Sequence, residues 1–143
     1  MKKYPRVLSA TTMIGDKVVS TTGEDLGTLK ELMIDLDEGR VNYAVLSFGG
    51  FLGLGDKLFA IPWEALTLNT DDHDFILQVD KEKLENAPGF DKDDWPDEAR
   101  YESGWLLDVY DHYGYTPYWM NGSEQDHQDR KEKIHDQVRG NLL

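Results

Sequence analysis

The sequence predicts a mainly β fold: a small antiparallel barrel or sandwich, followed by a helical or irregular extension that is rich in aromatic residues. Three observations predict it. Residues 1–80 contain several short apolar runs separated by turn-forming residues, a pattern typical of such β folds. The chain has 143 residues, which is enough for one domain with its own core. Nine of its sixteen aromatic residues fall between Phe90 and Trp119.

The N-terminal part of the chain is expected to form three strands and a hairpin turn. Residues 8–14 end at a Gly-Asp turn signal, and residues 17–20 form a short β-branched run. Residues 26–36 place apolar side chains on even positions with two polar breaks, which indicates a half-buried strand. Its buried side would consist of Leu26, Leu32, Ile34 and Leu36. The segment Asp37-Glu38-Gly39 then closes a hairpin, in which Gly39 supplies the positive φ.

The next strands are predicted to form the centre of the fold. Residues 41–48 are apolar on both faces, so this strand should be covered on both sides. A glycine-rich loop follows, and residues 58–61 form a strand that stops at Pro62. Residues 66–68 and 75–77 flank the turn residues 71–74 and predict a second hairpin.

The second half of the chain predicts short helices and a polar tail. Residues 81–87 could form one or two helical turns, ended by Pro-Gly. Residues 105–113 have helical apolar spacing and are followed by Gly114, which predicts a short helix. We therefore divide the chain into a barrel over residues 1–80, an acidic aromatic extension packing on it over 81–119, and a polar, mobile or helical tail over 120–143.

The charge of the chain excludes several classes of partner. Lys and Arg number 15 and Asp and Glu 28, so the net charge is −13. Such a chain is repelled by nucleic-acid phosphates and by anionic membrane surfaces.

No apolar run is long enough for a membrane span, and the polar start of the chain is unlike a signal peptide, so we expect a cytoplasmic protein. The absence of cysteine rules out disulfides and thiolate chemistry.

Motifs that would carry chemistry fail on inspection. The glycine-rich loop over residues 49–57 has Asp56 where a phosphate-binding loop needs Lys, and Lys57 where it needs Ser or Thr. The acidic turn over residues 35–39 resembles the start of a calcium loop, but its twelfth position is Leu46 and not Glu. The histidines and carboxylates form no recognisable catalytic or zinc-binding pattern. We expect no catalytic residue, no cofactor and no specific metal site.

Two groups of apolar residues are candidates for interaction instead. Phe51, Leu52 and Leu54 lie in the glycine-rich loop, where they either cap an open barrel end or meet another surface. The aromatic segment either docks on the barrel or presents a groove or dimer face, and its candidate contact residues are Trp105, Tyr118 and Trp119. If the loop is an interface, Phe51→Asp with Leu54→Asp should weaken association without unfolding the domain.

Several segments, in order, resemble the PRC-barrel family. They comprise residues 14–19, 23–29, 33–41, 43–53 and 55–63, within an overall resemblance that covers about residues 8–80. The segments Ala87–Phe90, Trp95–Pro96, Tyr113–Tyr115 and Pro117–Trp119 are similar to the extension of bacterial stand-alone members.

The resemblance implies a small, mostly antiparallel β-barrel with a role in assembly and no catalytic residue set. One branch of the family is the cytoplasmic domain of the photosynthetic reaction-centre H subunit, and another is the C-terminal half of the ribosome maturation factor RimM. We therefore predict a non-enzymatic protein-interaction module that self-associates, most simply as a dimer. One alternative is a ribosome-maturation accessory that acts through a ribosomal protein, and a second is a small-ligand or metal-binding protein.

Overall fold

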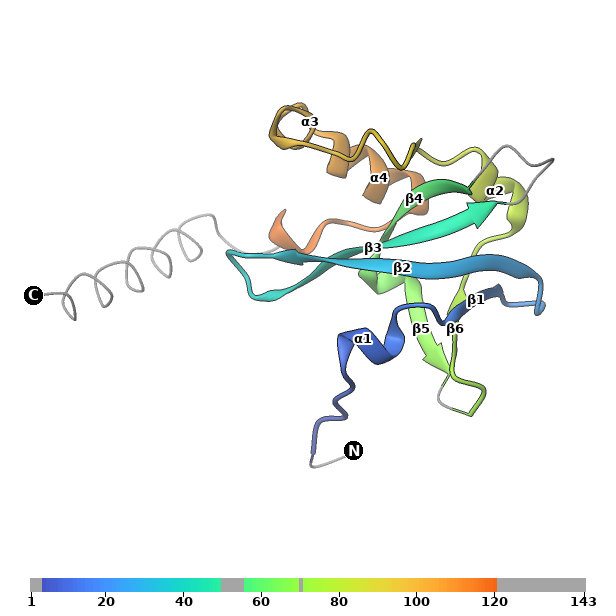
Figure 1. Ribbon diagram of the computed structural model, residues 1–143. Helices are drawn as coiled ribbons and strands as arrows, with labels where there is room; N and C mark the ends of the chain where they lie inside the picture. Colours follow the sequence, from blue (N-terminus) through green and yellow to red (C-terminus); the bar gives the residue numbers. More distant parts are fainter. Residues whose placement is uncertain (1–3, 50–55, 70, 121–143) are drawn as a thin grey trace, which may run out of the picture.

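The computed structural model of the protein describes residues 4–49, 56–69 and 71–120 (Figure 1). Its main feature is one seven-stranded sheet with the order β5-β6-β1-β2-β3-β4-β7. The strands are β1 (Lys17–Ser20), β2 (Asp25–Asp35), β3 (Arg40–Gly49), β4 (Asp56–Pro62), β5 (Leu66–Asn69), β6 (Asp74–Leu77) and β7 (Gly89–Phe90). The predicted mainly β fold is confirmed.

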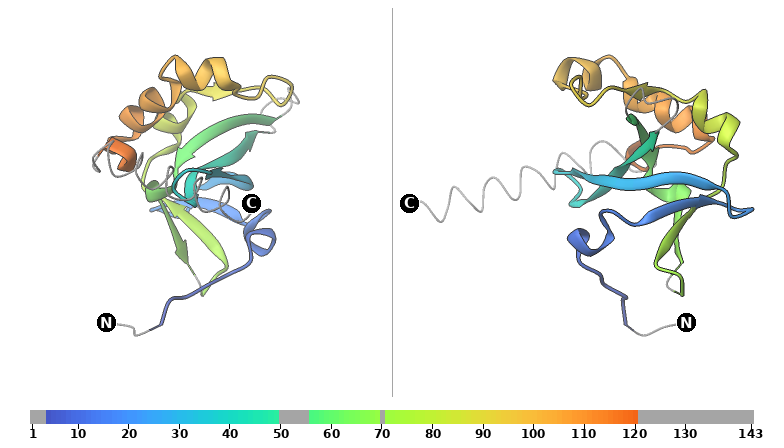
Figure 2. Two further views of the ribbon diagram at one scale, coloured as in Figure 1. Left: turned by 90° about the vertical axis from the view of Figure 1, so that its left-hand side faces the viewer. Right: turned by 45° about the vertical axis from the view of Figure 1, so that its right-hand side comes forward.

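The sheet differs from a purely antiparallel barrel in two respects. Strands β1 and β6 pair in parallel, whereas all the other neighbouring pairs are antiparallel, so the sheet is mixed. Within the described residues hydrogen bonds do not close the sheet, and β5 and β7 lie at its two edges. The sheet is nevertheless strongly curved, as the two views of Figure 2 show.

The β2–β3 hairpin is its longest element and forms where the sequence predicts it. The backbone N–H of Gly39 donates to the Asp35 carbonyl at 2.8 Å, and Gly39 has the expected positive φ of 65°. The Asp35 side chain also accepts hydrogen bonds from the backbone N–H groups of Asp37 and Glu38. The acidic turn is therefore an ordinary hairpin turn, held by its first carboxylate.

Strand β3 is covered on both faces, as predicted. Pairing places Leu29, Leu46 and Phe59 on one face of the sheet, and all three are buried. Tyr43 belongs to the opposite face and packs edge-on against Trp105 at 5.9 Å between ring centroids. The core therefore lies on both sides of the central strands.

Two local predictions are wrong. Residues 8–14 do not form a strand, because α1 (Ala10–Met13) lies there and its turn closes with Ile14 N–H donating to Ala10 O at 3.1 Å. The alternation of β2 on even positions also fails from Leu29 onward, because Leu29 is buried and Ile34 is exposed. The β2–β3 pairing shifts register between Leu29 and Glu31 and between Met33 and Ile34. The first shift places an extra residue, Lys30, in β2, and the second places an extra residue, Asn42, in β3.

The second half of the chain is short helices and turns. The helices are α2 (Lys81–Glu85), α3 (Glu98–Glu102) and α4 (Trp105–Tyr113), with 3-10 turns η2 (Trp63–Ala65) and η3 (Tyr118–Met120). Helix α4 has the predicted bounds and ends at Gly114, which has a φ of 79°. The sequence did not predict α3 or the two-residue strand β7. Figure 1 shows α3 and α4 lying along one side of the sheet.

Candidate functional site

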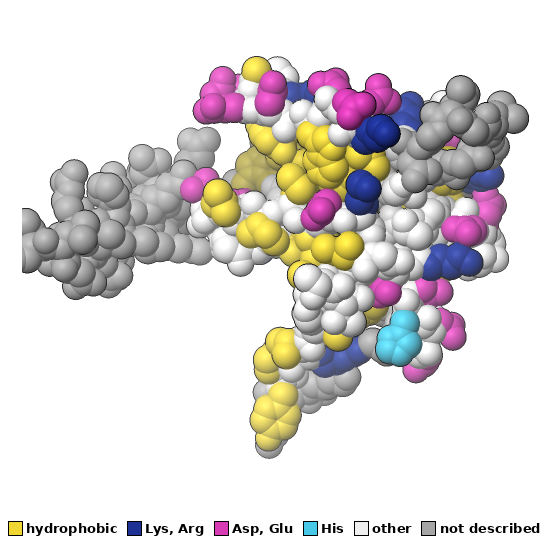
Figure 3. Space-filling model, in the orientation of Figure 1, with side chains coloured by type: hydrophobic (Ala, Val, Ile, Leu, Met, Phe, Trp, Pro, Cys, Tyr) yellow, Lys and Arg dark blue, Asp and Glu magenta, His cyan; other side chains and the backbone are white. Residues whose placement is uncertain are grey.

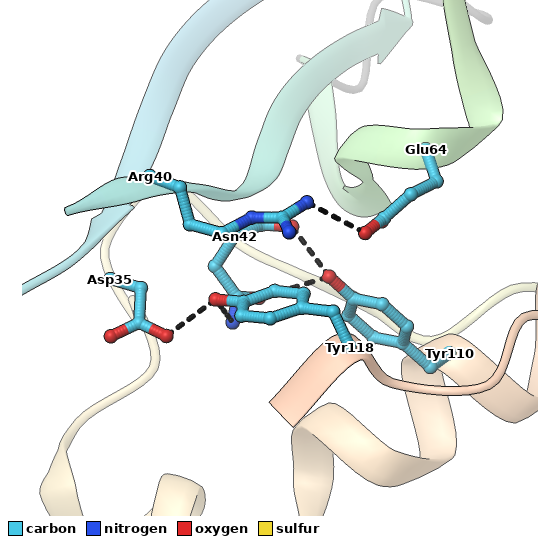
Figure 4. Close-up of polar contacts among 6 residues, drawn as sticks. All are labelled: Asp35, Arg40, Asn42, Glu64, Tyr110 and Tyr118. Atoms are coloured by element: carbon cyan, nitrogen blue, oxygen red, sulfur yellow. Dashed lines mark hydrogen bonds and ion pairs between the residues drawn. The ribbon is translucent and has the colours of Figure 1, made fainter. Parts of the chain in front are cut away.

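The end of the β2–β3 hairpin carries a network of polar side chains that comes from five elements of the chain (Figure 4). We call this network the hairpin junction. It joins β2, β3, η2, α4 and η3, and its members are Asp35, Arg40, Asn42, Glu64, Tyr110 and Tyr118.

Tyr110 fixes helix α4 to the sheet. Its side chain is fully buried, and its hydroxyl donates to the backbone carbonyl of Asn42 at 2.7 Å. Burial is the main cause that raises the pKa of this hydroxyl above its ordinary value. The group therefore stays protonated and serves as a hydrogen-bond donor.

Tyr118 joins η3 to the hairpin. Its hydroxyl donates to Oδ2 of Asp35 and accepts a hydrogen bond from Nδ2 of Asn42 at 3.0 Å. The guanidinium of Arg40 lies 3.8 Å from the centre of the Tyr118 ring and forms an ion pair with Glu64 at 2.9 Å. Burial, followed by the hydrogen bond to Asp35, raises the pKa of Tyr118. A hydroxyl held in this state positions the chain and does not act as a base.

The junction holds η3, which carries the exposed side chain of Met120, against a hairpin end that also has exposed apolar side chains. Ile34 precedes Asp35 and is 53% exposed, and Leu36 follows it and is 91% exposed. Met120, two residues after Tyr118, is 61% exposed. Figure 3 shows hydrophobic side chains at this end of the molecule and a larger group of them between the hairpin and helices α3 and α4. We call Ile34, Leu36 and Met120 the hairpin-end patch. An exposed cluster of this kind suits contact with another protein surface.

The predicted interaction residues Tyr118 and Trp119 lie together beside this patch. Their ring centroids are 5.2 Å apart, and Trp119 also packs edge-on against Tyr110 at 4.9 Å. Both side chains are half-buried. Trp119 therefore contributes to the packing of η3 against α4, and Tyr118 to the attachment of η3 to the hairpin.

Trp105, the third predicted aromatic residue, belongs to a different cluster. Its ring contacts Tyr43, Phe90 and Tyr101 with centroids 5.9 to 6.2 Å apart. The hydroxyls of Tyr43 and Tyr101 share a hydrogen bond of 2.7 Å, and burial raises the pKa of Tyr43. These contacts place Trp105 against β3 and β7.

Three other sequence predictions concern the glycine-rich loop, metal binding and membrane crossing. Phe51, Leu52 and Leu54 lie outside the described residues, so their role stays a prediction. Across the described ranges, no three or more His, Asp or Glu side chains gather as metal ligands would. In the same part of the chain, no helix is both long and apolar enough to cross a membrane.

Sequence reasoning missed the hairpin-end patch and most of the junction. The even positions of the pattern predict Ile34 and Leu36 as buried, but β2 ends at Asp35 and Leu36 lies in the turn, where the alternation of a strand no longer holds. The partners in the junction are far apart in sequence: Asn42 and Tyr110 are 68 positions apart, and Asp35 and Tyr118 are 83. No local pattern signals such pairs.

Comparison with known proteins places the chain in a family. The PRC-barrel domain family matches residues 5–84, which is more than half of the 143 residues. None of the curated proteins matches the sequence. The matched segment includes β1 to β6, the hairpin and Asp35, Arg40, Asn42 and Glu64 of the junction. The chain belongs to the PRC-barrel domain family.

Proposed function

We propose that this protein is a non-enzymatic protein-interaction module that associates with itself through the hairpin-end patch. The observation that carries the proposal is the exposure of Ile34 and Leu36 at the hairpin end and of Met120 on η3, which Tyr118 ties to that end through its hydrogen bonds with Asp35 and Asn42. Membership of the PRC-barrel family supports a role in protein interaction.

The patch has the physical properties of a contact surface. Fully burying an aliphatic side chain of this size stabilises a complex by roughly 1.5–3 kcal/mol, so a partner that covers these three would gain substantially. The junction also fixes the backbone on either side of the patch before any partner arrives. A pre-ordered surface loses less conformational entropy on binding than a flexible one.

The chemistry of the junction supports a structural role for it and not a catalytic one. The hydroxyls of Tyr110 and Tyr118 are held by hydrogen bonds with raised pKa values, and the Asp35 carboxylate accepts three hydrogen bonds. Groups engaged in this way are poor candidates for a nucleophile or a general base.

Sedimentation equilibrium of the full chain tests the proposal. The wild-type protein should have a mass above that of a 16.4 kDa monomer, and the Ile34→Asp, Leu36→Asp variant should move towards the monomer by at least tenfold in dissociation constant. Leu107→Asp is the matched control, because Leu107 is an exposed apolar residue on α4 outside the patch. Circular dichroism should show all three proteins folded. A monomeric wild type would contradict the proposal. So would an effect of Leu107→Asp equal to that of the Ile34→Asp, Leu36→Asp variant.

A basic protein partner is the second candidate, because the net charge of −13 would speed its encounter at low salt. A ribosomal protein is one such partner, which would make the chain a ribosome-maturation accessory. Co-sedimentation with ribosomal subunits, lost in the Ile34→Asp, Leu36→Asp variant, would support this candidate over self-association.

A further inference from the structure

A second group of exposed apolar residues lies at the N-terminal end of the described chain. Residues 4–8 precede α1, form neither helix nor strand, and run away from the sheet (Figure 1). We call them the N-terminal arm. Tyr4 is 80% exposed, Val7 is 87% exposed, and Leu8 is half exposed. Apolar side chains left uncovered on an extended segment suit a partner surface better than water.

The arm also differs in charge from the rest of the molecule. The first fifteen residues contain Lys2, Lys3 and Arg6 and no Asp or Glu, in a chain whose net charge is −13. The hairpin end has the opposite sign: Asp35, Asp37, Glu38 and Glu64 stand against Arg40, a local balance of 1 − 4 = −3. The arm and the hairpin-end patch are therefore complementary both in apolar character and in charge.

We infer that the N-terminal arm of one copy docks on the hairpin-end patch of a second copy. Tyr4, Val7 and Leu8 of the arm cover Ile34, Leu36 and Met120, while Arg6 lies beside the carboxylates of the hairpin turn. Five extended residues span at most about 18 Å, so the arm can reach beyond its own domain. The inference rests on the proposed self-association and names the segment that performs it.

Charge argues against the simplest alternative, in which two hairpin-end patches meet face to face. That arrangement would bring the acidic turns of two chains together, although both chains are already strongly acidic. Contact between like charges at an interface lowers affinity, whereas the basic arm offsets the repulsion locally. Reciprocal exchange of two arms across a two-fold axis also closes the assembly as a dimer.

Site-directed cross-linking tests the inference directly, because the chain has no native cysteine. A Val7→Cys protein and a differently tagged Leu36→Cys protein would be mixed and oxidised mildly, and covalent dimers would be separated without reductant. A disulfide forms only if the two Cβ atoms approach within about 4.5 Å. Since each chain carries one cysteine, every cross-link is intermolecular. We expect the Val7→Cys with Leu36→Cys heterodimer to exceed by at least fivefold a control that pairs Val7→Cys with Leu107→Cys.

Charge reversal supplies the second measurement. Arg6→Glu should weaken association at least tenfold at low salt and less at high salt, because ions screen the charge pairing. Arg6→Lys, which keeps the charge, is the matched control and should associate almost as the wild type does. Both variants leave the core untouched, since the arm is exposed.

The outcomes separate the inference from the function on which it rests. If Leu36→Cys protein cross-links mainly to itself, or if association persists while Val7→Cys and Leu36→Cys do not join above the control, the arm inference is overturned and self-association stands. If the wild-type chain is a monomer by sedimentation, both fail. Binding of the patch to a basic protein in place of a second copy would likewise overturn the arm inference.

Discussion

Tyr110 and Tyr113 lie one turn apart on α4, and both side chains are buried, but their hydroxyls are in opposite situations. The hydroxyl of Tyr110 donates to Asn42 O. The hydroxyl of Tyr113 is buried without a hydrogen-bond partner among the described residues. Burial alone accounts for the raised pKa of Tyr113. The tyrosine hydroxyl therefore stabilises the fold at position 110 and destabilises it at position 113.

This contrast predicts opposite effects of one chemical change. Tyr110→Phe should lower the free energy of unfolding by about 1–2 kcal/mol, because it removes a hydrogen bond and leaves a buried carbonyl less well satisfied. Tyr113→Phe should leave the stability unchanged or raise it by up to about 1 kcal/mol, because it removes an unsatisfied group. Urea denaturation of both variants measures the difference. Equal losses in the two variants would show that Tyr113 has a partner.

At the scale of the element, β2 depends on Gly27. This residue has a φ of 117°, and a Cβ atom built on it would lie 2.1 Å from the carbonyl oxygen of Ser47 on β3. Neither the backbone conformation nor the space admits a side chain. The two longest strands of the sheet can therefore pair closely here only because residue 27 is glycine.

Gly27→Ala should accordingly destabilise the fold by about 3–5 kcal/mol, from backbone strain together with the clash against β3. Gly23→Ala is the matched control. Gly23 has a φ of 85° but open space around its Cβ position, so its substitution should cost about 1–2 kcal/mol from strain alone. Thermal and urea unfolding would rank the two variants. Similar losses would mean that β2 and β3 move apart at little cost.

Local sequence patterns predict correctly those helices and turns that depend on residues within a single segment. Residues 105–113 were expected to be a helix because their apolar spacing and the following glycine lie within one segment. The hairpin turn at Gly39 was predicted for the same reason. The irregularities of the β2–β3 pairing could not be predicted, since they depend on how two separate strands meet.

The arrangement of the whole molecule depends on contacts that no segment encodes alone. The parallel pairing of β1 with β6 joins Val18 to Phe75, and the junction joins Asp35 to Tyr118. A list of strands, read from the sequence, suggested hairpins and therefore an antiparallel sheet. The sheet is mixed because β6, which is antiparallel to β5 on one side, pairs in parallel with β1 on the other. For the same reason, the sequence predicts that the candidate site contains aromatic residues, but it does not place that site at the hairpin end.

Four tyrosines link the stability of the whole molecule to alkaline pH. The pKa values of Tyr43, Tyr110, Tyr113 and Tyr118 are all raised above the ordinary value, with burial as the largest cause. In the unfolded chain a tyrosine ionises near pH 10, as exposed tyrosines do. These groups therefore contribute stability that is fully present below about pH 10 and is lost as the pH rises from there towards the folded values.

We therefore expect the protein to unfold cooperatively above about pH 10, with these four tyrosines ionising as the fold is lost and not before it. Tyrosinate absorbance and near-ultraviolet circular dichroism, recorded on the same samples, would show the two transitions coinciding. Tyr113→Phe removes one of the linked protons, so the free energy of unfolding should fall less steeply with pH in this variant, by about 1.4 kcal/mol per pH unit at most. Ionisation of all seven tyrosines with the folded dichroism spectrum retained would contradict the linkage. It would mean that water reaches the hydroxyls of the core and of the junction while the sheet stays intact.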